Sequence, residues 1–120
     1  MILFDANMIL RYLLNDDPDM AKKAEQFIIA GDVFVTIEVI AEVVYVLKGV
    51  YHLDRQTTAD TVLTFLSLVN CQEHDILETA LHTYATHNLD FVDCVLFAYH
   101  KARNIQIATF DKKLLRLLNQ

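Results

Sequence analysis

Four acidic side chains lie in or beside apolar stretches of the chain, where a carboxylate is costly to keep. They are Asp5, Glu42, Asp93 and Asp111. A buried charge costs several kcal/mol unless it is hydrogen-bonded, paired with a cation or bound to a metal ion. Carboxylate oxygens are the ligands that Mg²⁺ and Mn²⁺ prefer, and a cluster of them in a cleft suits the hydrolysis of phosphate esters. The sequence therefore raises the hypothesis of a shared metal site.

Glu42 and Asp93 interrupt the two most apolar helical stretches. Glu42 stands in IAEVVYVL and Asp93 in FVDCVLFAY, where every other residue is apolar or aromatic. Because the helix around Glu42 is apolar on nearly all sides, we expect its carboxylate to be buried. No cation lies one helical turn from Glu42, since Lys48 is six residues further on. An ion pair with a residue distant in sequence is the structural alternative.

Three of the four acids also have a purely structural interpretation as helix caps. Asp5 can cap the helix that follows it, and Asp111 can cap the last helix. Asp93 can be the third residue of a helix capped by Asp90, which is an aspartate version of the capping box. These interpretations would all have to hold at once and without matching cations, whereas one metal site explains the four acids together.

Other catalytic chemistries find little support in the sequence. The five histidines show no i,i+4 pair or other zinc spacing, and two glycines cannot form a phosphate-binding loop. Cys71 and Cys94 lie in apolar surroundings without a metal or redox spacing between them. This pattern indicates free buried thiols in a reducing cytoplasm.

Length and composition fit one globular domain over residues 1–120. The chain is 54% hydrophobic and 22% charged, which excludes a disordered protein. No apolar run approaches the roughly 18 residues of a membrane span, and MILFDAN has no basic segment of a signal peptide. We therefore expect a cytoplasmic protein.

The net charge of −6 disfavours nucleic-acid binding, unless metal ions neutralise clustered acids and the remaining surface is locally basic. Five of the ten lysines and arginines fall within the last twenty residues. They form either a solvated helix surface or a rim that contacts phosphates. These cations are Lys101, Arg103, Lys112, Lys113 and Arg116.

Apolar runs separated by capped helices predict a parallel sheet of about four strands, covered on both faces. The expected strands are 1–4, 33–35, 68–72 and 105–109, and the expected helices are 18–30, 36–48, 54–67, 74–87, 91–103 and a last one from 111. Such sheets bind ligands at the carboxyl ends of strands where the strand order reverses. Asp5 ends the first strand and Asp111 closely follows the last, so the two carboxylates face each other if these strands are neighbours.

Four acidic motifs follow one another along the chain: MILFDAN, IAEVVYVL, LDFVDCVLFAY and IATFDKKL. In this order they resemble the PIN-domain ribonucleases, and among these the VapC-type toxins of type II toxin–antitoxin systems. The resemblance covers essentially the whole chain. It implies catalytic and metal-binding roles for Asp5, Glu42, Asp93 and Asp111, with Asp90 as a further acid. Asn7 and Thr109 match polar positions that orient the carboxylates, while Ala6 replaces a threonine common in the family.

The resemblance also implies a three-layer α/β/α fold with the strand order 3-2-1-4. It implies endonucleolytic cleavage of RNA with Mg²⁺ or Mn²⁺, a homodimer, and inhibition by a small cognate antitoxin. Two alternatives stay open: a catalytically silent PIN-like domain that binds RNA or protein, and an RNA-maturation nuclease without an antitoxin. The presence of all four acids favours an enzyme.

Overall fold

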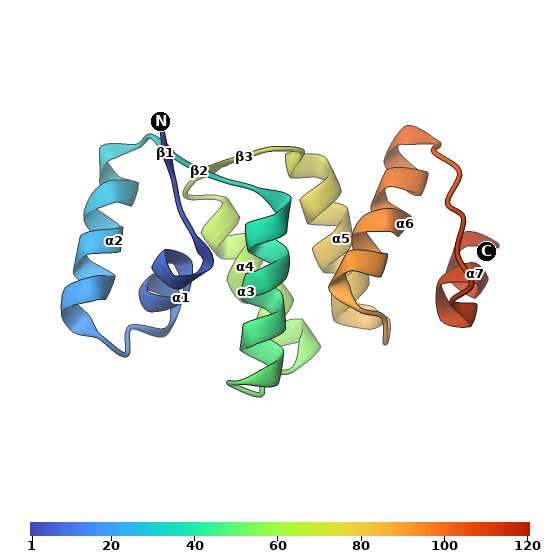
Figure 1. The fold of residues 1–120 in the computed structure, drawn as a ribbon, viewed down its shortest axis with the longest axis horizontal. Coiled ribbons are helices and arrows are strands. Elements are labelled where there is room, and N and C mark those ends of the chain that lie inside the picture. The colour runs from blue at the N-terminus through green and yellow to red at the C-terminus, as the bar shows by residue number, and fades with distance from the viewer.

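The computed structural model describes all 120 residues and contains seven helices and three short strands (Figure 1). The elements are β1 Ile2–Leu3, α1 Ala6–Leu14, α2 Pro18–Ala30, β2 Val33–Val35, α3 Ile37–Gly49, α4 Arg55–Leu66, β3 Asn70–Cys71, α5 His74–Thr86, α6 Phe91–Arg103 and α7 Lys112–Leu118. The α/β class predicted from the sequence is confirmed. No helix is long and apolar enough to cross a lipid bilayer.

Local capping signals set most helix ends where the sequence predicts them. The Asp17 carboxylate accepts a hydrogen bond from the Met20 N–H at 3.2 Å, and α2 begins between them. Gly31 ends α2 with φ 91°, a left-handed conformation that glycine adopts without strain. Thr36 caps α3, which runs one residue further than expected and includes Gly49.

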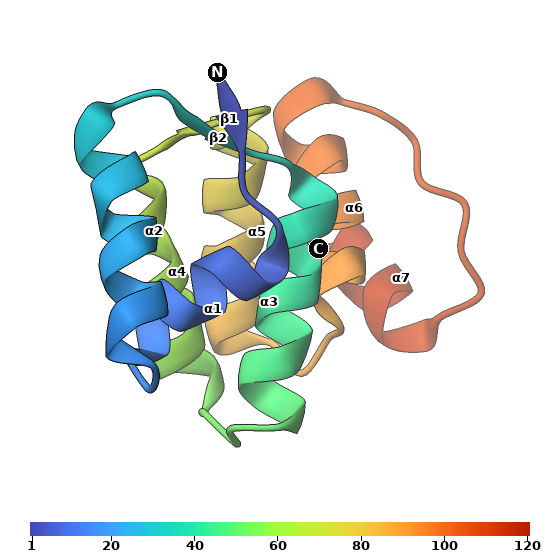
Figure 2. The same cartoon turned by 60° about the vertical axis from the view of Figure 1, so that its left-hand side comes forward.

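The sheet is parallel, with the strand order β1-β2-β3. Ile2 pairs with Val33 at one junction, and Phe34 pairs with Asn70 at the other. This order agrees with the 3-2-1 part of the expected 3-2-1-4 arrangement. The strands run along the upper edge of both views, with the helices below them (Figures 1 and 2).

The fourth strand predicted at 105–109 does not form. α6 ends at Arg103, and the next residue, Asn104, has a left-handed φ of 54° that turns the chain away. The chain then loops away from the helices before it reaches α7 (Figure 2). None of the backbone N–H groups from 105 to 110 donates to a backbone carbonyl. Ile107 packs against the core, and the Ile105 carbonyl lies 3.0 Å from the His100 Nδ1. The segment is apolar enough for a strand, but it has no partner strand.

Helix packing supplies most of the core. Val43, Val44 and Leu47 of α3 are at most 1% exposed, so the apolar face expected for this helix is part of the core. Leu77 and Leu81 of α5 are fully buried. α5 packs between α4 and α6, and it thereby links the half of the molecule that contains the sheet to the half that contains α7.

We expect the backbone amides of 105–109 to exchange with solvent far faster than those of α5, because they have no backbone acceptors. Hydrogen exchange followed by NMR measures both sets in one sample, with the buried helix α5 as the internal reference. Protection of alternate amides in 105–109 would instead indicate that this segment pairs with the free edge of β1 in solution.

Candidate active site

Three carboxylates gather in one pocket between the beginning of α6 and the beginning of α7. Asp90 is the N-cap residue of α6, Asp93 lies in its first turn, and Asp111 is the N-cap residue of α7. All three line the same pocket, together with Lys112 and Lys113. Two of the four acids predicted as ligands therefore lie close together, along with the additional acid Asp90.

The Asp93 carboxylate has no polar partner in the structure. Its side chain is half-buried, and no hydrogen bond or ion pair reaches the carboxylate. Burial, followed by the negative charges of Asp111 and Asp90, raises the pKa of Asp93. The capping-box interpretation fails, because Asp90 makes no side-chain capping hydrogen bond at the start of α6.

Asp5 and Asp111 do cap helices, as their structural interpretation predicts. The Asp5 Oδ1 accepts a hydrogen bond from the Met8 N–H, and the Asp111 Oδ1 accepts one from the Leu114 N–H, each at 2.8 Å. The Thr109 hydroxyl accepts a hydrogen bond from the Asp111 N–H at 3.0 Å, which fixes the backbone at this cap. In both caps the hydrogen bond involves only one of the two carboxylate oxygens.

Asp5 and Glu42 do not line the acidic pocket. Asp5 and Asn7 are exposed at the start of α1, and α1 and α7 lie in opposite halves of the molecule (Figure 1). The expectation that Asp5 and Asp111 face each other depended on the fourth strand, and it fails with that strand. As the chain stands, no three histidine, cysteine or acidic side chains converge closely enough to hold one metal ion.

The expected burial of Glu42 is wrong, because its side chain is exposed. α3 buries only one face, formed by Ile40, Val43, Val44 and Leu47. Glu42 lies on the other face, where Tyr45 is 78% exposed. Ala41 and Tyr45 line a groove that also includes Asp90, so this turn of α3 lies near the beginning of α6.

The chemistry of the pocket fits a hard divalent cation. Its acids offer only oxygen ligands, and burial together with the negative charges of Asp111 and Asp90 raises the pKa of Asp93. A bound Mg²⁺ or Mn²⁺ would remove the repulsion between these charges. Asp90, Asp93 and Asp111 all line this pocket, and they would have to converge further to hold the ion together.

A line of cationic side chains continues from the acidic pocket along α7. Lys113 also lines a neighbouring hollow with Arg116 and His87, and the two hollows share Asn88 and Leu89. The sequence drew attention to Lys112, Lys113 and Arg116 as a phosphate rim, although nothing in it assigned them to the acidic pocket. Asn88 has no sequence signal that would have identified it.

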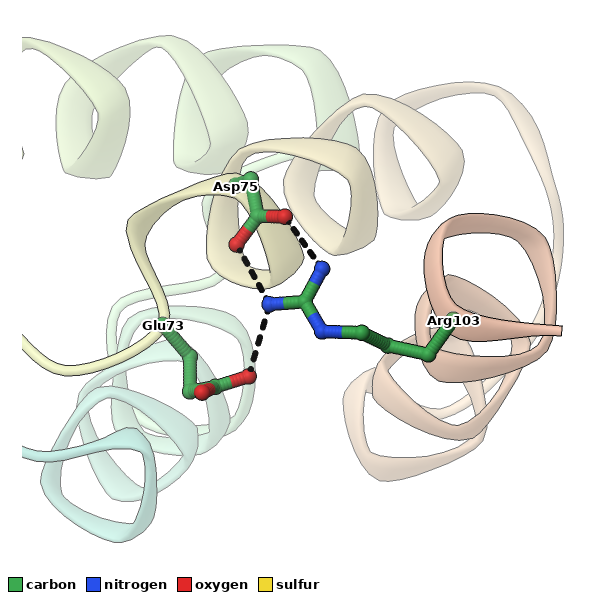
Figure 3. Close-up of polar contacts among 3 residues, drawn as sticks. All are labelled: Glu73, Asp75 and Arg103. Atoms are coloured by element: carbon green, nitrogen blue, oxygen red, sulfur yellow. Dashed lines mark hydrogen bonds and ion pairs between the residues drawn. The ribbon is translucent and has the colours of Figure 1, made fainter. Parts of the chain in front are cut away.

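Arg103 does not belong to this rim. Its guanidinium donates two hydrogen bonds to Asp75, at 2.6 and 3.1 Å, and one to Glu73 at 3.1 Å (Figure 3). These bonds raise the pKa of Arg103 and lower the pKa of Asp75. The guanidinium therefore ties the end of α6 to the beginning of α5, at the opposite end of α6 from Asp90.

The thiol beside Asp93 is not suited to nucleophilic catalysis. Cys94 is buried, and burial raises the pKa of its thiol to about 12. A thiol with this pKa is protonated at neutral pH and is a poor nucleophile. Cys71 is also free, as expected, but it is only half-buried.

Comparison with known families identifies one domain in the chain. The model of the PIN domain family matches residues 2–118. No curated protein and no solved structure matches the chain. The match covers every helix and strand described above, including the acidic pocket and the cationic helix α7.

We expect Asp93→Asn to stabilise the metal-free protein at neutral pH. Because the pKa of Asp93 is raised above 3.8, the native state binds this proton more tightly than the unfolded chain does. Stability therefore falls as the pH rises through the raised pKa, and the penalty remains at pH 7. Melting temperatures in EDTA should show a gain for Asp93→Asn at pH 7 that shrinks as the pH is lowered toward 4.

The matched control is Asp19→Asn, which makes the same chemical change in the first turn of α2. A negative charge is favourable there, so this variant should gain nothing. A lower melting temperature of Asp93→Asn at pH 7 would show that the Asp93 carboxylate supports the fold.

Proposed function

Since the chain belongs to the PIN-domain family, which has a nuclease fold, we propose that it is a metal-dependent endoribonuclease. We further propose that it is the toxin of a VapC-type toxin–antitoxin module. One observation carries the proposal of an enzyme: Asp93, Asp90 and Asp111 crowd into one pocket beside Lys112 and Lys113. Asp93 is partly buried beside the like charges of the exposed Asp90 and Asp111, and a cation bound among them would offset the cost of its charge.

In this proposal Asp93 and Asp111 hold Mg²⁺ or Mn²⁺, with Asp90 as a further ligand. Asp5 and Glu42 are the further ligands that the sequence motifs suggest, although neither lines this pocket. The capping role of Asp5 and Asp111 is compatible with this, because each cap uses Oδ1 and leaves Oδ2 for a metal ion. The fifth acid, Glu42, is free of ion pairs, and its helix lies near the start of α6.

A bound divalent cation would supply an activated water and stabilise the leaving oxygen of a phosphodiester. The chain itself contributes the arrangement of charge around that ion. Lys112 and Lys113 lie on the same pocket as the acids, where they can attract a phosphate toward the metal site. Thr109 holds the backbone of Asp111, and Asn7 is the second polar residue proposed to orient a carboxylate.

RNA is the proposed substrate, because the cationic side chains of Lys113 and Arg116 lead away from the acidic pocket. A single RNA strand places phosphates at regular intervals, and lysine and arginine side chains along a groove neutralise them. The cations Lys112, Lys113 and Arg116 beside these hollows support RNA binding despite the net charge of −6.

For the partners, we propose a homodimer and a small cognate antitoxin, in the cytoplasm. An antitoxin that places a basic side chain in the pocket of Asp90, Asp93 and Asp111 would compete directly with the metal ion. The separation of Asp5 from this pocket favours a second candidate, a catalytically silent domain that binds RNA or a protein partner. An RNA-maturation nuclease without an antitoxin is the remaining alternative.

We expect the purified protein to cleave RNA only when Mg²⁺ or Mn²⁺ is present, and EDTA to abolish cleavage. Asp93→Asn should lower kcat at least ~100-fold, because a ligand of the ion and its positioned water are lost. Asp19→Asn on α2 serves as the control and should retain full activity. Equal activity of Asp93→Asn and the wild type would place the metal site elsewhere, and no cleavage by the wild type would favour the silent domain.

We expect the double substitution Lys113→Gln with Arg116→Gln to weaken RNA binding. Loss of two phosphate contacts should reduce the slope of log Kd against log salt concentration by about 1.4 for a single strand. Fluorescence anisotropy at several salt concentrations measures this slope. The matched control replaces two exposed lysines of α2, Lys22 and Lys23, and an equal effect of that control would remove α7 from the binding surface.

A further inference from the structure

A second arginine, Arg55, lies next to the loop that connects α5 to α6. It is the first residue of α4, where Asp54 caps the helix by accepting a hydrogen bond from the Thr57 N–H at 2.7 Å. The half-buried guanidinium lies over the ring of Tyr84, with 4.3 Å from its central carbon to the ring centroid. Helix capping on one side and the aromatic ring on the other thus fix the position of the charge.

The guanidinium makes four hydrogen bonds within a stretch of six residues. Its Nη1 donates to the carbonyl oxygens of Tyr84, His87 and Leu89, at 3.1, 2.7 and 2.8 Å. Its Nη2 donates to the side-chain oxygen of Asn88 at 3.3 Å. The final carbonyls of a helix have no partner within the helix, and a cation at that end is favoured by the helix dipole. Arg55 therefore donates to a carbonyl in the last turn of α5 and fixes the backbone of the loop that follows.

This loop leads directly into the acidic pocket. Asn88 and Leu89 line the pocket themselves, and Asp90 is the next residue along the chain. Asp90 makes no capping hydrogen bond of its own, so no side-chain bond to the helix end holds it in place. Phe91 packs edge-to-face on Tyr84, the same ring that Arg55 covers, with 6.1 Å between the ring centroids.

From this geometry we propose that Arg55 is a positioning residue for the acidic pocket. It touches neither the proposed metal ion nor the RNA, and it acts by fixing the backbone of 87–89 and hence the placement of Asp90 and of the first turn of α6. The part of the proposal that concerns metal binding and cleavage rests on the proposed function. The part that concerns the loop does not depend on it.

Arg103 provides a matched control, because it also contacts α5. Both arginines join α5 to another element through hydrogen bonds of one guanidinium, but Arg103 acts at the far end of α6 (Figure 3). Twelve helical steps separate the two ends of α6, about 18 Å along its axis at 1.5 Å per residue. Substitution of either arginine should lower the stability of the fold, whereas only substitution of Arg55 should disturb the arrangement of the acidic pocket.

The test compares Arg55→Met with Arg103→Met, since methionine keeps an unbranched aliphatic stem and removes the charged group. Hydrogen exchange should show that the amides of Leu89 and Cys94 exchange at least tenfold faster in Arg55→Met and within twofold of the wild type in Arg103→Met. Calorimetric titration with Mn²⁺ alone should give at least a fivefold weaker Kd for Arg55→Met and no change for Arg103→Met. The kcat for RNA cleavage should fall with the Mn²⁺ affinity, while KM changes less.

Arg55→Lys addresses the case in which Arg55→Met does not fold. Lysine keeps the charge but lacks the planar fork that serves several acceptors at once, so it should give intermediate exchange rates. Wild-type exchange at Leu89 and Cys94 in a folded Arg55 variant would overturn the proposal, as would equal losses in Arg103→Met. A wild type that binds no Mn²⁺ and cleaves no RNA would overturn the proposed function alone, because the exchange experiment still decides the role of Arg55.

Discussion

The packing of α5 between α4 and α6 is the constraint on which the rest of the structure depends. The three strands contribute only two, three and two residues, too few to form a core of their own. Fully buried side chains of α5, such as Ile76, Leu77 and Leu81, supply apolar contacts that the sheet does not. Because α6 and α7 are attached to the rest mainly through this packing, the position of the acidic pocket depends on how α5 and α6 meet.

Polar contacts at the two ends of the α5–α6 pair complement this apolar packing. Arg103 binds Asp75 and Glu73 at one end, and Arg55 binds the backbone carbonyls of the loop at the other. Apolar contacts alone are non-directional, whereas hydrogen bonds to fixed carbonyls specify one geometry. The acids lie at the end where Arg55 holds the backbone in place.

The acids illustrate how capping and catalysis can draw on the same residue type. A carboxylate at a helix N-cap is stabilised by the first N–H groups of the helix, and it still has a second oxygen for a ligand. Asp111 is stabilised in this way, while Asp93 bears the cost of burial beside like charges with no bond to offset it. A carboxylate that destabilises the fold is a stronger indication of function than one that also stabilises a helix end.

The sequence by itself determined local features such as the ends of α2 and α6, which lie at the residues predicted for them. These depend on residues within one helical turn of each other. It also placed the acidic motifs, of which Asp90, Asp93 and Asp111 share a pocket.

Only the tertiary structure decided that 105–109 has no partner strand, that Glu42 is exposed, and that Arg55 reaches the loop before α6. A strand needs an edge to pair with, the burial of one helix face depends on which helices cover it, and a hydrogen bond across more than thirty residues depends on how two helices pack. None of these is fixed by neighbours in the chain, because each is a property of surfaces that meet only when the chain has folded.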